Sequence, residues 1–204
     1  MEQNPVLGFY RRYSPWTIPF CVIERGFCVI ERGFCVANVI SYEKKNMDMM
    51  CSNGSMDVLL TTIGLSGSYL AEQWYEKDLI VWLMEKDQSV VGLGTVGFDI
   101  SEMPWNKIYF AKQKAFLYKT LQCTKKCVGW DTLDYMPNKI LLFEKIDVLQ
   151  KMLTKMVLED IDDEAIQQWY DECDMIEPMK NGYPVCEKHG ILLSAYGCMA
   201  CHDI

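Results

Sequence analysis

The chain has 204 residues, of which 50% are hydrophobic and 12% aromatic, and its formal net charge is −8. This length suits one domain with or without a small appendage, and the apolar content is enough for a packed core, which excludes a disordered chain. An acidic protein repels nucleic-acid phosphates and favours basic partners, so we expect no direct binding of nucleic acid.

No targeting or membrane segment is expected either. The N-terminus lacks the basic start, apolar run and small-residue cleavage site of a secretory signal. No uninterrupted apolar run approaches the length of a membrane span. The ten cysteines are irregularly spaced, which is typical of reduced thiols rather than of a disulfide scaffold. We therefore expect a soluble, cytoplasmic protein.

Residues 1–57 are expected to form an irregular arm. Within it, the seven residues 21–27 (Cys-Val-Ile-Glu-Arg-Gly-Phe) are repeated without change as residues 28–34. Two short copies are too few for a solenoid, and the glycine in each copy disfavours a coiled coil. A local duplication in a loop or hairpin is the favoured interpretation. The polar stretch that follows ends in a turn signal at Asn53 and Gly54.

The middle of the chain predicts an antiparallel hairpin. Residues 78–84 and 89–98 are strand-like runs separated by a polar turn. Gly92, Gly94 and Gly97 in the second run indicate a bulge or the close approach of another backbone. They do not form a dinucleotide-binding fingerprint, because no helix is expected to open after them.

Two later segments have the periodicity of helices. Residues 110–123 mix apolar residues with lysines, as in an amphipathic helix. Further on, apolar residues recur at spacings of four, three, four and three, which predicts a helix with one apolar stripe. The stripe is short for a dimer seam, so we assign it to the core. It consists of Leu142, Ile146, Leu149, Leu153 and Met156.

Residues 159–177 hold nine acidic residues and no lysine or arginine. A helix over 162–173 would place several of these acids in its first turn, where the helix macrodipole favours them. They form either a solvated helix face or an acidic patch that binds a basic partner, with two aromatic side chains as anchors. The residues of that patch are Asp162, Asp163, Glu164, Trp169, Tyr170, Asp171 and Glu172.

The C-terminal tail, residues 183–204, carries the clearest chemistry. Cys186 and His189 are separated by two residues, and so are Cys198 and Cys201. Two such pairs complete the tetrahedral site that zinc prefers, so we predict a zinc site with His202 as a possible extra ligand. Gly190 and Gly197 lie where tight turns need residues without a Cβ.

Two alternatives compete with zinc. The cysteines can be small buried hydrophobes, or Cys198 and Cys201 can form a disulfide, which leaves Cys186 and His189 unexplained. Because a catalytic zinc keeps one open position, four protein ligands favour a structural site. Glu187, next to the first cysteine, lacks the helical spacing of a metalloprotease base.

No catalytic constellation is recognisable elsewhere. Both histidines of the chain lie in the tail, which removes the usual general base. No signature marks an activated serine or cysteine nucleophile. An enzyme of unknown class with an unrecognised pocket is therefore the weaker hypothesis, and a non-catalytic binding module is favoured.

Several motifs resemble those of small, acidic, uncharacterised bacterial proteins, some of which confer immunity to polymorphic toxins. They are residues 97–105 (Gly-Phe-Asp-Ile-Ser-Glu-Met-Pro-Trp), Gly129-Trp130, and the Cys-x-x-His and Gly-Cys-x-x-Cys motifs of the tail. The resemblance covers about residues 60–202. It implies that an acidic surface blocks a basic toxin domain without catalysis, and it identifies no contact residue.

The sequence thus predicts one α+β domain over residues 1–178, followed by a zinc-binding tail. Its antiparallel sheet should include residues 79–98, with helices near 110–122, 139–157 and 162–173. The favoured function is a protein-binding module for a basic protein, with a zinc-stapled regulator or adaptor as the alternative.

Overall fold

The computed structural model describes residues 37–173 and 176–201. These belong to one compact unit, residues 35–204. The heptapeptide duplication and His202 lie outside the described residues, so the predictions for them stay untested.

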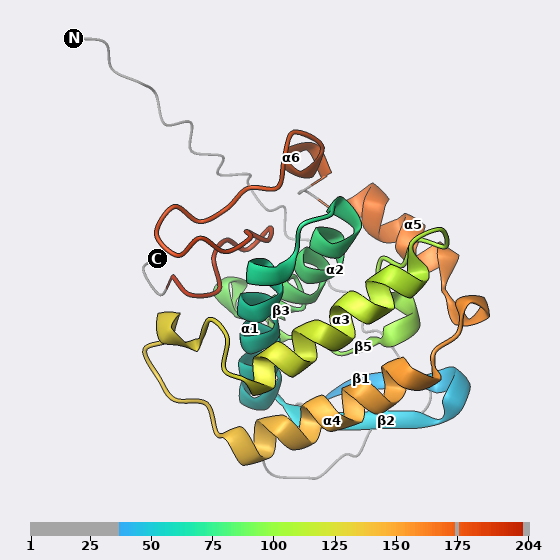
Figure 1. Cartoon of the computed structure of the whole chain (residues 1–204), viewed down its shortest axis with the longest axis horizontal. Helices are drawn as coiled ribbons and strands as arrows, with labels where there is room; N and C mark the ends of the chain where they lie inside the picture. The colour runs from blue at the N-terminus through green and yellow to red at the C-terminus, as the bar shows by residue number, and fades with distance from the viewer. Residues whose placement is uncertain (1–36, 174–175, 202–204) are drawn as a thin grey trace. The chain divides into compact units, whose positions relative to one another are not determined.

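Within the described residues, five short strands form two small sheets (Figure 1). The first sheet has the order β2-β1-β5: β2 is antiparallel to β1, from Ala37 opposite Ser52 to Tyr42 opposite Met47, and β5 is parallel to β1. The second sheet pairs β3 with β4 antiparallel. The strand bounds are β1 Ala37–Tyr42, β2 Met47–Ser52, β3 Asp87–Gln88, β4 Gly94–Thr95 and β5 Phe98–Asp99.

Helices make up most of the described chain and pack around these two small sheets (Figure 1). Side chains cap several of them, as in α1, where Ser52 Oγ accepts a hydrogen bond from the backbone N–H of Ser55 at 3.2 Å. Short 3-10 turns lie between the longer elements. The helix bounds are α1 Asn53–Leu70, α2 Trp74–Met84, α3 Phe110–Lys125, α4 Lys139–Lys155, α5 Asp163–Glu172 and α6 Ile176–Lys180.

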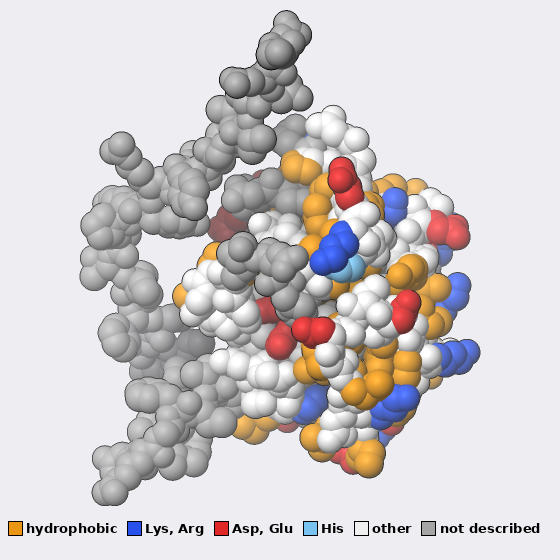
Figure 2. Space-filling view, turned by 90° about the vertical axis from the view of Figure 1, so that its left-hand side faces the viewer, with side chains coloured by type: hydrophobic (Ala, Val, Ile, Leu, Met, Phe, Trp, Pro, Cys, Tyr) orange, Lys and Arg blue, Asp and Glu red, His pale blue; other side chains and the backbone are white. Residues whose placement is uncertain are grey.

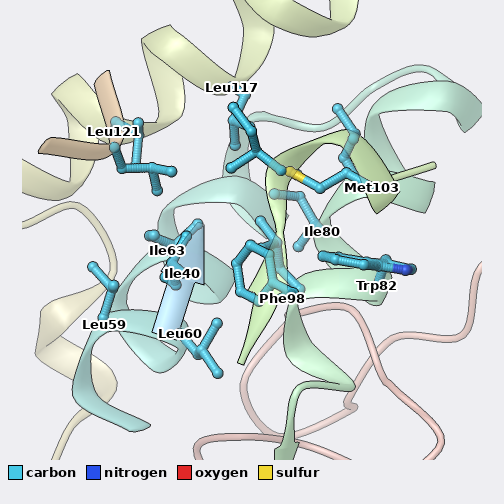
Figure 3. Close-up of a cluster of buried hydrophobic side chains, with 14 of the residues drawn as sticks. Ile40, Leu59, Leu60, Ile63, Ile80, Trp82, Phe98, Met103, Leu117 and Leu121 are labelled. Atoms are coloured by element: carbon cyan, nitrogen blue, oxygen red, sulfur yellow. The ribbon is translucent and has the colours of Figure 1, made fainter. Parts of the chain in front are cut away.

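The core lies between α1, α2, α3, α4 and the sheet, and Figure 3 shows part of it. Ile40 of β1, Leu60 of α1 and Leu117 of α3 are fully buried there. Trp82 of α2 meets Phe98 of β5 edge to face, with ring centroids 5.0 Å apart. A contiguous cluster of this kind is the main source of the folding free energy, because it removes apolar surface from water.

Two glycines allow close approaches of the backbone inside this core. A Cβ at Gly67 of α1 would lie 2.2 Å from Cδ1 of Ile80, so α2 packs directly against the backbone of α1. A Cβ at Gly97 would lie 2.5 Å from the carbonyl oxygen of Val39, so the chain entering β5 passes close to the backbone of β1. The expectation of a close backbone approach in the glycine-rich run is therefore confirmed at Gly97.

The predicted hairpin over residues 78–98 is wrong. Residues 78–84 form the second half of α2, and residues 89–91 form a 3-10 turn. In α2 every residue from Leu79 to Met84 is buried. A helix that is apolar on all sides has no visible period, and a short apolar run of this kind is read from sequence as a buried strand.

The prediction of an irregular arm over residues 1–57 is also wrong for its last third. Residues 37–52 form the β1–β2 hairpin, and the turn signal at Asn53 and Gly54 begins α1. The three later helices are confirmed as α3, α4 and α5, and the apolar stripe of α4 is buried throughout. Helices together with small antiparallel and mixed sheets confirm the α+β class. Among the residues that the structure describes, no helix is both long and apolar enough to cross a lipid bilayer.

Candidate metal centre

Two tight turns position the four predicted ligands. In the first, the backbone N–H of Cys186 donates to the carbonyl of Ile191 and the N–H of Gly190 donates to the carbonyl of Cys186, both at 2.8 Å. Gly190 has a φ of +67°, a left-handed conformation that glycine adopts without a Cβ penalty. This turn carries Cys186 and His189 on the same side.

The second turn has the same plan. Ser194 and Gly197 exchange backbone hydrogen bonds at 3.1 and 2.9 Å, and Gly197 has a φ of +90°. The chain then folds back, and the N–H of Cys201 donates to the carbonyl of Cys198 at 3.1 Å. The predicted role of both glycines in the turns is therefore confirmed.

The tail is docked on α1. Ser68 Oγ accepts a hydrogen bond from the backbone N–H of Leu192 at 3.1 Å. A Cβ at Gly64 would lie 3.1 Å from Sδ of Met199, so the second turn also lies close to the helix backbone. Figure 2 views the molecule from this side, with the described histidine at the surface. Beneath the turns lies a second apolar cluster of Leu65, Ile191 and Ala200, with Leu133, Cys186 and Cys198 packed against it.

The four ligand atoms converge on one point. The Nδ1 atom of His189 lies 3.4 Å from the Sγ atoms of Cys198 and Cys201 and 3.7 Å from that of Cys186. The Sγ atoms of Cys186 and Cys201 are 3.7 Å apart. All four ligand atoms lie within 4.8 Å of one another. These side chains can therefore hold a single metal ion.

The thiols of the cluster are free and differ in acidity. Cys186, Cys198 and Cys201 form no disulfide, so the alternative disulfide between Cys198 and Cys201 is absent. Burial opposes ionisation of Cys186, yet hydrogen bonds from the backbone of His189 and from neighbouring thiols lower its pKa to about 6. At Cys198, burial and the adjacent thiols raise the pKa to about 12. Glu187 beside the cluster is exposed.

The residues of the predicted acidic patch divide into three groups. Asp162 is the N-cap of α5 and accepts hydrogen bonds from the backbone N–H groups of Glu164 and Ala165 at 3.1 and 3.0 Å. Trp169 and Tyr170 are half-buried, with their rings 4.8 Å apart and their polar atoms bonded to α2. The side chains of Asp163, Glu164, Asp171 and Glu172 are exposed.

Two carboxylates, the buried Asp78 of α2 and the half-buried Glu85 directly after α2, accept hydrogen bonds from α5, and neither was predicted from the sequence. Asp78 accepts a hydrogen bond from Tyr170 Oη at 2.7 Å and another from Tyr183 Oη. Seven residues later, Glu85 accepts one from Trp169 Nε1 at 2.8 Å. Burial raises the pKa of both carboxyls, and these hydrogen bonds oppose that rise. The signal available in the sequence was an acid at each end of the apolar run 79–84.

Comparisons with protein-family models, with curated proteins and with solved structures found no match. Any function for this protein is therefore inferred from the geometry of the chain itself.

Proposed function

We propose that the protein is a non-catalytic, cytoplasmic protein-binding module whose C-terminal tail is held by a structural zinc ion. The observation that carries the proposal is the convergence of three thiols and one imidazole nitrogen within 4.8 Å. In a reducing compartment such thiols stay free to bind metal rather than pair as disulfides.

The spacing of the donor atoms supports zinc. With Zn–S bonds of about 2.3 Å and a Zn–N bond of about 2.0 Å, a tetrahedral site has S–S edges of roughly 3.8 Å and S–N edges of roughly 3.5 Å. The Sγ–Sγ distance of 3.7 Å and the Sγ–Nδ1 distances of 3.4–3.7 Å match these edges. A donor set with three sulfurs disfavours magnesium and calcium, which prefer oxygen.

The donor count supports a structural role. Cys186, His189, Cys198 and Cys201 fill the four positions of a tetrahedral ion and leave none for water or substrate. When bound, such an ion supplies folding free energy to a tail that has only a small apolar cluster of its own. The four side chains would hold the ion in a tail that packs against α1.

The outer face of α5 supports a basic partner. The exposed acids of α5 line a shallow hollow together with Gln167 and Gln168. A surface of one charge sign speeds the association of a partner of opposite charge and sets its orientation. We extend the proposal to a basic protein as the ligand of this face, in line with the resemblance to toxin-immunity proteins.

A pull-down with matched variants tests the partner. Glu164→Gln with Asp171→Asn removes two charges from the α5 face, and Asp48→Asn with Glu144→Gln removes two exposed charges elsewhere. From a bacterial lysate, the parent and the second variant should retain a basic protein that the first variant loses, more strongly at low than at high salt. Equal retention by both variants, or no basic protein at all, would contradict this function.

A further inference from the structure

The helix α5 depends on contacts with neighbouring elements for its stability. It has ten residues and none of them is fully buried. Helices shorter than about 12 residues are marginal by themselves in water. Its N-terminus is tied by a hydrogen bond from the N–H of Asp162 to the carbonyl of Ser101 at 3.1 Å. The ion pair between Lys107 and Asp163 is exposed and adds little.

The C-terminal half of α5 is bonded to two carboxylates, Asp78 in α2 and Glu85 directly after it, and the tail shares Asp78. Asp78, which is 2% exposed, receives Tyr170 from α5 and Tyr183 from the start of the tail. Tyr183 Oη also donates to the carbonyl of Trp74 at 3.0 Å. Each oxygen of the Asp78 carboxylate is therefore bonded to a different C-terminal element.

Glu85, directly after the end of α2, also accepts one hydrogen bond on each carboxylate oxygen. Trp169 Nε1 donates to one carboxylate oxygen at 2.8 Å, and the thiol of Cys173 donates to the other at 3.3 Å. The backbone of Ala195, in the second turn of the tail, helps to lower the pKa of Glu85 against the effect of burial. In Figure 1, α2 lies between the tail on one side and α5 on the other.

We propose that metal binding at the tail controls α5: with the metal bound, the tail completes the hydrogen bonds of Asp78 and fixes α5 against α2, and with the metal removed, α5 opens. This inference rests on the proposed metal site but not on the identity of the metal or of a partner. It makes the acidic face of α5 a surface that is fully formed only in the metal-bound protein.

The physical link is the burial of the carboxylates. Hydrogen bonds to a buried charge are stronger than the same bonds in water, because the local dielectric is low. When the tail leaves, Asp78 loses its hydrogen bond from Tyr183 and the backbone of Ala195 moves away from Glu85. Water then reaches both carboxylates. The remaining bonds to Tyr170 and Trp169 then compete with water, and the opening of α5 becomes more frequent.

Hydrogen exchange measured by mass spectrometry on the full-length chain tests this link. The protein is first shown to contain metal and is then treated with EDTA at neutral pH. Exchange in the tail and in peptides from residues 169–173 should become at least about tenfold faster, which matches the loss of one hydrogen bond to a charged group. Exchange in α3 and α4 should stay unchanged. Unchanged exchange in α5, or equal acceleration in all helices, would overturn the proposal.

A variant that keeps the metal ligands separates this link from the metal site itself. Tyr183→Phe removes one hydrogen bond to Asp78, and Tyr118→Phe, at an exposed position of α3, is the matched control. Tyr183→Phe should accelerate exchange in α5 while the metal content stays that of the parent, and the control should not. If Tyr183→Phe leaves α5 unchanged, the coupling is wrong, whatever the metal content. A chain without metal would contradict the metal site and its control of α5, whereas failure to bind a basic partner would contradict only the proposed function.

Discussion

Replacing Gly67 by alanine tests the close packing of α1 against α2. The new Cβ would lie 2.2 Å from Cδ1 and 2.7 Å from Cγ1 of Ile80, which is fully buried, so the Ile80 side chain has to change rotamer within a packed core or the two helices have to move apart. Overpacking of a core typically costs about 1–3 kcal/mol. Alanine regains at most about 1 kcal/mol through its higher helix propensity. We therefore expect a net loss of up to about 2 kcal/mol in the free energy of unfolding.

The same helix contains a matched control. Gly54 lies in the first turn of α1, and a Cβ there would meet no atom within 4 Å. Gly54→Ala should be neutral or stabilise by up to about 1 kcal/mol. Urea unfolding followed by circular dichroism measures both variants, each with its metal bound. Equal free energies of unfolding for Gly67→Ala and Gly54→Ala would refute the close packing of α2 against Gly67 of α1.

Two further substitutions test the core of α4 and the buried carboxylate of α2. Ile146→Ala, at a fully buried position, should lower the free energy of unfolding by about 2–5 kcal/mol. Ile140→Ala, at a position that is 73% exposed, should stay within about 0.5 kcal/mol of the parent in urea unfolding. Similar losses of stability in both variants would contradict the assignment of the buried face of α4. For Asp78, burial raises the native pKa above the unfolded value of about 3.9, so the native state binds more protons between these two pKa values. The parent should therefore gain stability relative to Asp78→Asn as the pH falls through that window, by at most about 1.4 kcal/mol per pH unit. A difference in unfolding free energy that is independent of pH would contradict the raised pKa.

The parts of the fold that were predicted correctly have a local signal. In α4, Ile146 and Leu149 face the core while Glu144 and Lys151 face water, so the helical period is visible. The cluster of three thiols and one imidazole is equally local, because each pair of candidate ligands is joined by a single turn. Ligand type and spacing were therefore enough to find all four residues.

The parts that were missed depend on contacts between distant segments. In β1 the buried positions alternate, but one of them is Asn38, whose side chain bonds to Asn53 and Thr95 at 2.6 and 2.5 Å. A polar residue at a buried position hides the pattern of the strand. The carboxylates of Asp78 and Glu85 were missed for the same reason, because their tyrosine and tryptophan partners are about 90 residues away in sequence. Sequence periodicity alone contains no information about such pairs.

Metal content is the most direct test of the account. Elemental mass spectrometry should find about one zinc per chain in the purified parent, and none after Cys198→Ser and Cys201→Ser together, because two ligands cannot hold a closed tetrahedral site. A parent without metal, or a double variant that retains it, would contradict the metal centre on which the proposed function is built.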